Sequence, residues 1–187
     1  MANRNTQGFG LIPAGTLGQT PSTSGQGKYK IDAGYGTTIY QGGAVASTAG
    51  YIIDGHTTDA PILGVLNGIF YNAATTLKPT FANFYKTPIT PANSEDVDAF
   101  VFDNPQQQYV VATDAAVTQA GFLESYDMNT SAGSDTTGKS SATLDIGDTS
   151  ADAASFRLLR SAEDPENDEN SAFRSVVVCI NLIELQS

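Results

Sequence analysis

The chain has 187 residues, enough for one domain of ordinary size with a sizeable core that needs no disulfide or metal. Charged residues make up only 16% of it, apolar residues make up 40%, and the net charge is −11. Because an acidic chain without a cluster of lysines and arginines repels phosphate backbones and anionic lipids, we expect no nucleic-acid partner and no membrane partner.

The charge is distributed unevenly. Residues 1–93 carry five basic and three acidic side chains, a net charge of +2, whereas residues 94–187 carry four and seventeen, a net charge of −13. The only cysteine, Cys179, lies in an apolar run and is predicted to be a buried, unreactive thiol. No apolar run follows Arg4 and none approaches 18 residues, so we expect neither a secretion signal nor a membrane span.

Residues 1–27 are predicted to form an extended N-terminal arm. They contain six glycines and two prolines and show little hydrophobic periodicity, so the segment is not expected to fold alone. A terminus without a role is the alternative. Its large apolar side chains are the expected anchors of the arm in a groove on a partner: Phe9, Leu11, Ile12 and Leu17.

From residue 28 the chain is predicted to form short strands separated by turns. Asn67-Gly68 gives the best hairpin signal, because both residues tolerate the positive φ of a type I′ turn. Asp54-Gly55 and Asp103-Asn104-Pro105 are further turn signals, and residues 116–126 fit a short helix or a strand. The expected strands cover residues 28–32, 37–40, 51–53, 62–66, 69–71, 80–85, 99–102, 109–112, 142–146, 156–159 and 174–185, the last as a strand covered on both faces.

These elements predict a mostly-β fold. Short strands with frequent turns indicate a compact antiparallel β-sandwich or barrel, β-tulip or jelly-roll-like, rather than alternating βαβ units. We find no internal repeat and no linker that would divide the core. We therefore expect a single β-rich domain over residues 28–187, preceded by the arm of residues 1–27.

No pattern typical of an enzyme occurs in the sequence. His56, the only histidine, lies in a polar turn near Asp59 and is predicted to be a surface residue. No serine or cysteine lies in a nucleophile-elbow pattern, and one histidine cannot supply the several ligands of a zinc site. We expect no catalytic residues, no cofactor and no metal, and the chain is predicted not to be an enzyme.

Three motif matches are interpreted as surface loops or chance. Residues 133–140 fit the phosphate-binding pattern G-x-x-x-x-G-K-[ST], but no buried strand enters them and no helix leaves them, so a plain loop is predicted. Residues 163–169 hold five carboxylates without the EF-hand spacing, so a solvated loop is expected. Whether this loop binds a cation is left open by the sequence. Asn129-Thr130-Ser131 matches a glycosylation acceptor, which we interpret as chance.

Several segments together resemble the capsid decoration, or cement, proteins of tailed phages, including those of cyanobacterial and other marine hosts. The resemblance runs over most of the chain. It implies a compact β-domain with an extended N-terminal arm on the outer capsid surface, commonly as trimers and sometimes as dimers, and it brings no catalytic residues. The segments that carry it are residues 1–13, 28–31 with the following Gly/Tyr turn, 61–68, 100–105 and 163–167.

The expected function is therefore that of a non-enzymatic virion protein. It would be made in the host cytoplasm, bind the major capsid protein on the outer surface of the shell, cement the capsomers together, and associate with itself as a trimer or a dimer. The alternative is a fibre or host-surface module with a carbohydrate-binding groove. Aromatic side chains exposed in a groove would favour that alternative, for example Tyr71, Phe84 and Tyr85.

Overall fold

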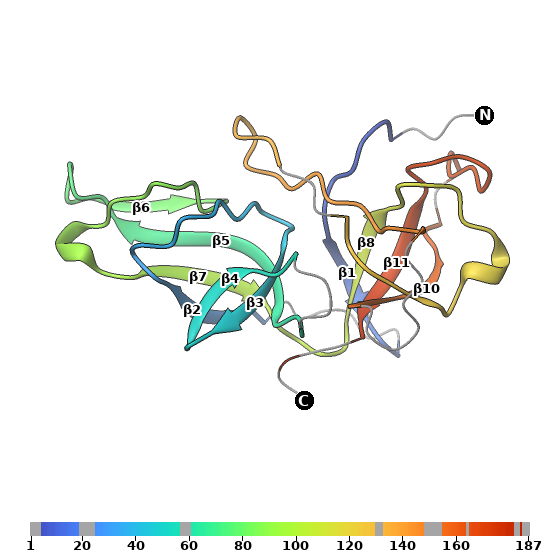
Figure 1. The fold of residues 1–187 in the computed structure, drawn as a ribbon, viewed down its shortest axis with the longest axis horizontal. Coiled ribbons are helices and arrows are strands. Elements are labelled where there is room, and N and C mark those ends of the chain that lie inside the picture. The colour runs from blue at the N-terminus through green and yellow to red at the C-terminus, as the bar shows by residue number, and fades with distance from the viewer. Residues whose placement is uncertain are drawn as a thin grey trace.

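The computed structural model describes residues 5–18, 25–56, 61–129, 133–147, 155–163, 165–181 and 184. They form eleven strands in two antiparallel sheets, of five and six strands, which pack as a sandwich (Figure 1). The only helical elements in these residues are single 3-10 turns at Ala92–Ser94 and Gln119–Gly121. The predicted antiparallel β-sandwich is confirmed.

The five-stranded sheet has the order β1-β8-β11-β10-β9. Its central strand, β11, is buried at every position, which confirms the prediction of a strand covered on both faces. Every neighbouring pair in the sheet is antiparallel. The strands are β1 (Ile12–Thr16), β8 (Gln107–Ala112), β9 (Ser125–Tyr126), β10 (Phe156–Ser161) and β11 (Ser175–Ile180).

The six-stranded sheet has the order β2-β7-β5-β3-β4, and β6 pairs with β5. The predicted turn at residues 103–105 joins β7 to β8 and so carries the chain from one sheet to the other; the Asn104 carbonyl accepts from the Gln107 amide at 2.9 Å. The strands are β2 (Gly27–Ile31), β3 (Ala44–Thr48), β4 (Tyr51–Asp54), β5 (Gly64–Asn72), β6 (Pro79–Ala82) and β7 (Val97–Phe102).

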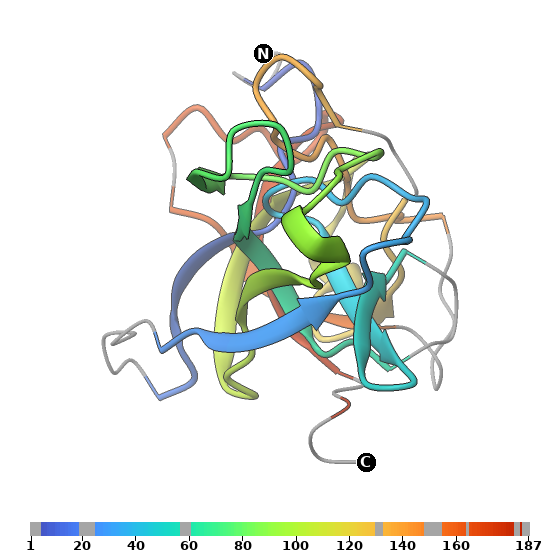
Figure 2. The same cartoon turned by 90° about the vertical axis from the view of Figure 1, so that its left-hand side faces the viewer.

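Two hydrophobic cores hold the molecule together. One lies between the sheets, where Leu158 and Val178 of the five-stranded sheet meet Val65 of the other. The second covers the opposite face of the six-stranded sheet, which curves around it (Figure 2). Successive side chains of a strand point to opposite faces, so Phe102 on β7 reaches the first core while Val101 lies in the second. The six-stranded sheet thus has apolar residues on both faces.

The hairpin expected at Asn67-Gly68 does not form. β5 runs straight through it, and the register against β7 shifts between Leu66 and Gly68, which marks a β-bulge. Both predicted arms pair with β7 instead of with each other, so long-range pairing overrides the local turn preference. A tight turn joins β3 to β4 at Ala49 and Gly50, which both have positive φ. The predicted turn at Asp54-Gly55 is not a hairpin turn, because the Gly55 amide donates to the Ala44 carbonyl of the neighbouring strand β3.

Other expected strands are present in part. Residues 37–40 and 142–146 contribute isolated bridges, Ile39 to Tyr85 and Leu144 to Thr113 and Met128, because their partners are themselves loops. Residues 116–126, whose sequence fits either a short helix or a strand, contain the 3-10 turn Gln119–Gly121 and then β9. The strands expected at 28–32, 99–102, 109–112 and 156–159 are β2, β7, β8 and β10.

The N-terminal segment is built into the sandwich. β1 pairs with β8, and Leu11 is 1% exposed in the core between the sheets. This placement differs from the expected free arm, because the glycines that indicated flexibility permit close packing instead. Gly10 has a φ of +72° and donates to the Ala142 carbonyl at 3.1 Å, and a side chain at Gly8 would collide with the backbone of Ser141.

Candidate functional site

The four predicted arm anchors occupy different environments. Leu11 is buried, Phe9 is half-buried, and Ile12 and Leu17 are 50% and 41% exposed. Phe9, Leu11 and Ile12 line one side of a hollow of about 230 Å³ between the sheets. Ile12 and Leu17 are therefore the two anchors that remain free to contact a partner.

An aromatic patch lies on the face of the six-stranded sheet opposite the second core, the face that also bears Phe102 of β7. Its members are Phe70 on β5, Phe81 on β6 and Phe100 on β7, with ring centroids 4.7 Å apart for Phe70 and Phe81 and 6.4 Å apart for Phe81 and Phe100. Phe81 is 74% exposed, the largest exposure of any large hydrophobic side chain in the described residues. The neighbouring residues Ile69 and Ala99 point into the second core, so the strand alternation directs Phe70 and Phe100 to the opposite face of the sheet.

A charged cluster borders the aromatic patch. Asp98 is paired in register with Phe70. Its carboxylate forms ion pairs with Lys28, whose Nζ lies 2.8 Å from Oδ2, and with Lys30, whose Nζ lies 2.6 Å from Oδ1. Both lysine side chains are more than half exposed. Burial raises the pKa of the Asp98 carboxyl, but hydrogen bonds from the two ammonium groups outweigh it and hold the pKa below its usual value. Asp96 and Glu95 also act electrostatically on Lys30, so the border carries charges of both signs.

The hairpin of β5 and β6 exposes one more apolar side chain. Leu77 in the connecting loop is 71% exposed and has a φ of +53°, a conformation that leucine rarely adopts. The Leu77 amide donates to the Ala73 carbonyl at 2.8 Å, which fixes the loop. The hairpin therefore presents Leu77 and Phe81 to the surroundings.

The three aromatic residues considered for a carbohydrate groove do not lie in one place: one is in the core and two line a hollow. Tyr85 is 1% exposed and its hydroxyl donates to the Tyr35 carbonyl at 2.8 Å, so it belongs to the core. Tyr71 and Phe84 line a hollow of about 470 Å³ beside the β5–β6 hairpin. The Phe84 ring stacks on Tyr40 with centroids 5.6 Å apart, which holds it in one orientation.

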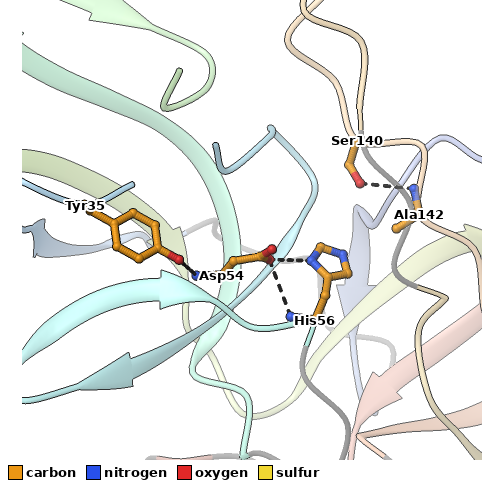
Figure 3. A network of polar contacts seen from close by, with 5 residues as sticks. All are labelled: Tyr35, Asp54, His56, Ser140 and Ala142. Carbon is orange, nitrogen blue, oxygen red and sulfur yellow. Dashed lines mark hydrogen bonds and ion pairs between the residues drawn. The ribbon is translucent and has the colours of Figure 1, made fainter. Parts of the chain in front are cut away.

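His56 is not the surface residue that its polar surroundings predicted. Its side chain is 12% exposed, and its Nδ1 lies 2.5 Å from Asp54 Oδ1, while the Asp54 amide donates to the Tyr35 hydroxyl at 2.8 Å (Figure 3). Its Nε2 is buried and finds no hydrogen-bond partner in the described part of the chain. Asp59 lies outside the described residues. The pair fastens the end of β4.

Ser140, drawn beside this pair in Figure 3, takes part in a local bond instead. Its side chain is 3% exposed, and its hydroxyl accepts from the Ala142 amide at 3.1 Å. A buried hydroxyl held by its own loop is not presented to a substrate. The Asp54–His56 pair and Ser140 thus do not form a reactive site that solvent can reach.

The phosphate-loop match at residues 133–140 folds as a tight hairpin. Gly133 and Ser140 form an antiparallel bridge, and the Ser134 amide donates to the Lys139 carbonyl at 2.9 Å. The Asn83 side chain donates to the Thr137 carbonyl at 2.7 Å and ties the tip to the residue that follows β6. In residues 141–147, the described segment that follows, there is no helix whose amide groups would bind phosphate, so the predicted plain loop is confirmed.

An asparagine fastens the acidic loop to the start of β11. Asn167 Oδ1 accepts from the Ser175 amide at 2.8 Å and its Nδ2 donates to the Ser175 carbonyl at 2.7 Å. The described residues contain no cluster of three metal-binding side chains. Asp164 in this loop and Thr130-Ser131 of the glycosylation match lie outside the described residues.

Cys179 is 8% exposed, as predicted, and burial raises the pKa of its thiol. A thiol held in its neutral form by burial is a poor nucleophile, which agrees with the predicted unreactive role.

The comparisons with known proteins give no relative. No protein-family model matches the chain, and no curated protein and no solved structure shows significant similarity to it. Within the described residues, no helix has the length and apolar character needed to cross a membrane. The surface geometry is therefore the structural basis for a functional proposal. Sequence reasoning missed the aromatic patch, although the alternation of Phe100 with Ala99 and of Phe70 with Ile69 was a usable signal.

Proposed function

We propose that the chain is a non-enzymatic structural protein of a phage virion, which binds the outer surface of the capsid and cements neighbouring capsomers. The observation that carries the proposal is the aromatic patch, in which the exposed Phe81 packs between the half-buried rings of Phe70 and Phe100. Scattered apolar side chains are normal on protein surfaces, but three contiguous aromatic rings with a charged border are typical of an interaction site. The sequence resemblance to decoration proteins supplies the kind of partner.

The patch suits a rigid docking surface. It lies on three hydrogen-bonded strands, so no loop must be ordered on binding, which lowers the entropic cost of association. Fully burying one phenylalanine is worth about 1.5–3 kcal/mol, so covering Phe81 contributes roughly a thirtyfold gain in affinity. The exposed Ile12 and Leu17 would add a second contact from the N-terminal segment.

The charged border adds selectivity to this docking. Lys28 and Lys30 lie beside the patch together with Asp98, and Asp96 and Glu95 also act on Lys30. A partner surface whose charges complement this mixed border is favoured over one that places like charges opposite it. The border would therefore help to set the orientation of the protein on the shell.

Co-sedimentation with undecorated capsids of the phage that encodes the chain tests the proposal. We expect the parent to sediment with the shells and Phe81→Ser to lose at least tenfold in affinity. The matched control is Leu17→Ser, which removes an exposed apolar side chain of the N-terminal segment instead. A parent chain that does not sediment with the shells would overturn the cement role. Equal binding by Phe81→Ser, with a loss in Leu17→Ser, would place the contact on the N-terminal segment.

A second candidate function is a carbohydrate-binding module of a fibre. The hollow beside Tyr71 and Phe84 favours it, because a sugar ring packs well on an aromatic face held in a fixed orientation. Gold labelling of virions separates the two functions, since label over the whole shell means cement and label at the tail tip means fibre. Binding of the chain to a glycan array, lost in Phe84→Ala, would support the second candidate.

A further inference from the structure

A second surface feature lies at the far end of the five-stranded sheet, away from the aromatic patch. Beside β10, a hollow of about 430 Å³ is lined by Gln119, Phe122, Leu123, Leu159, Arg160 and Arg174. The feature combines an apolar wall with two guanidinium groups. The proposed capsid contact does not use it.

The guanidinium of Arg174 carries a buried charge without an acidic partner. Arg174 is 7% exposed; its Nη1 donates to the Val117 carbonyl at 2.7 Å, and its guanidinium lies 5.4 Å from the centre of the Phe122 ring. Its Nε is buried without an acceptor, and no carboxylate pairs with it in the described residues. A buried charge is costly unless it is paired, so a group that supplies the missing negative charge would be bound favourably.

Positive charge gathers around this hollow against the trend of the sequence. Residues 94–187 carry only four basic side chains, and two of them, Arg160 and Arg174, line the hollow. A third, Arg157, donates from Nε to the carbonyl of Leu123 on the rim at 3.1 Å. In a half with a net charge of −13 this is the place where an anion meets a favourable potential.

The backbone around the hollow is held in costly conformations. Leu123 and Phe173 have φ of +67° and +58°, two of the six non-glycine residues with positive φ in the described chain. The Phe173 amide donates to the Thr113 carbonyl at 2.9 Å, which fixes the backbone beside Arg174. The pairing of β10 with β11 shifts register between Leu158 and Arg160, a bulge that redirects the Leu159 and Arg160 side chains. Strained residues and bulges of this kind concentrate at binding sites.

We infer that this hollow binds a carboxylate group attached to a small apolar body. Arginine presents paired N–H donors that match the two oxygens of a carboxylate. The apolar wall of Phe122, Leu123 and Leu159 suits a hydrocarbon or aromatic portion better than a fully hydrated phosphate. The inference does not depend on the proposed capsid role.

Titration calorimetry with phenylacetate tests this inference on the full chain, with phenylacetamide and inorganic phosphate as comparison ligands. We expect phenylacetate to bind and phenylacetamide, which lacks the charge, to bind at least tenfold more weakly. Phosphate should also bind more weakly than phenylacetate. The capped dipeptide Ac-Phe-Glu-NH2 separates the two sources of a carboxylate, because tighter binding of the dipeptide indicates an acidic side chain of a protein and tighter binding of phenylacetate indicates a free organic acid.

Two variants assign the binding to the hollow. Arg160→Gln alters an exposed residue and should lower the affinity for phenylacetate at least tenfold. Lys139→Gln makes the same charge change outside the hollow and should leave that affinity unchanged. Arg174→Met should abolish binding yet unfold at the same or a higher temperature without ligand, because it removes an unpaired buried charge. If Arg174→Met fails to fold, Arg160→Gln still decides. The inference is overturned if phenylacetate does not bind, if phenylacetamide or phosphate binds as tightly, or if Arg160→Gln binds like the parent.

Discussion

The Tyr29 hydroxyl donates a 2.7 Å hydrogen bond to Asp103 Oδ2 and thereby ties β2 to the segment that crosses between the two sheets. Partial burial, followed by the hydrogen bond to Asp103, raises the pKa of Tyr29 to about 12. The bond joins residues 74 positions apart in the sequence and is one of the polar links that fix the crossover.

This link predicts a loss of stability at high pH. Because the pKa of Tyr29 is higher in the folded chain than in the unfolded chain, its contribution is fully present below about pH 10 and is lost as the pH rises toward 12. Tyr29→Phe should lower the free energy of unfolding by about 1 kcal/mol at pH 7. Urea titrations followed by tyrosine fluorescence measure this, since the chain has no tryptophan. The control Tyr51→Phe removes a longer bond of 3.3 Å to Asp96 and should have a smaller effect.

The Asp98 cluster predicts a loss of stability at low pH. The two lysines lower the pKa of Asp98 in the folded chain, so its contribution is present above about pH 4 and is lost as the pH falls through the folded value. Both lysines are more than half exposed and screened by solvent, so Asp98→Asn should cost only about 1 kcal/mol at neutral pH, less in high salt. Thermal unfolding at pH 7 and pH 3 measures the difference, which should be smaller at pH 3. A gap that stays equal at both pH values would show that charge is not the cause.

The buried position of Leu11 predicts that the N-terminal segment stabilises the whole sandwich. Leu11→Ala should lower the free energy of unfolding by about 2–4 kcal/mol, because it leaves a cavity between the sheets. The neighbouring control Ile12→Ala, at a side chain that is 50% exposed, should change it by less than about 1 kcal/mol. Chemical denaturation compares the two variants. A chain that begins at residue 28 should also be destabilised, and normal folding of that chain would mean that β1 is dispensable.

The β-bulge predicts that Gly68 tolerates no branched side chain. A Cβ at this position would lie 3.0 Å from the Ala82 carbonyl oxygen, so Gly68→Val must push β5 and β6 apart. We expect a loss of about 1–3 kcal/mol, measured by thermal unfolding. The adjacent Asn67→Ala is the control, and it should cost less. If Gly68→Val unfolds like the parent, the β5–β6 hairpin is loose enough to adapt.

Much of the secondary structure could be predicted from local patterns. Alternation identified β2, short apolar and aromatic runs identified β7 and β8, and a long apolar run identified β11 as a central strand. The polar turn at residues 103–105 was also placed correctly. The loop character of residues 133–140 also followed from the sequence, because the flanking residues lacked the buried strand and helix that a phosphate loop needs. These features depend on residues close together in the chain.

Only the tertiary structure decided the features that depend on distant partners. Asn67-Gly68 has the local preference of a turn, but pairing of both flanking segments with β7 makes it a bulge. The glycines on either side of Phe9 indicated a flexible segment, but they pack closely against the backbone of residues 141 and 142. The aromatic patch and the arginine hollow each gather side chains from segments at least eleven residues apart in the sequence. Local sequence determined where strands can form, whereas burial and long-range pairing determined which strands are neighbours and which side chains stay exposed, because those energies depend on contacts between residues far apart along the chain.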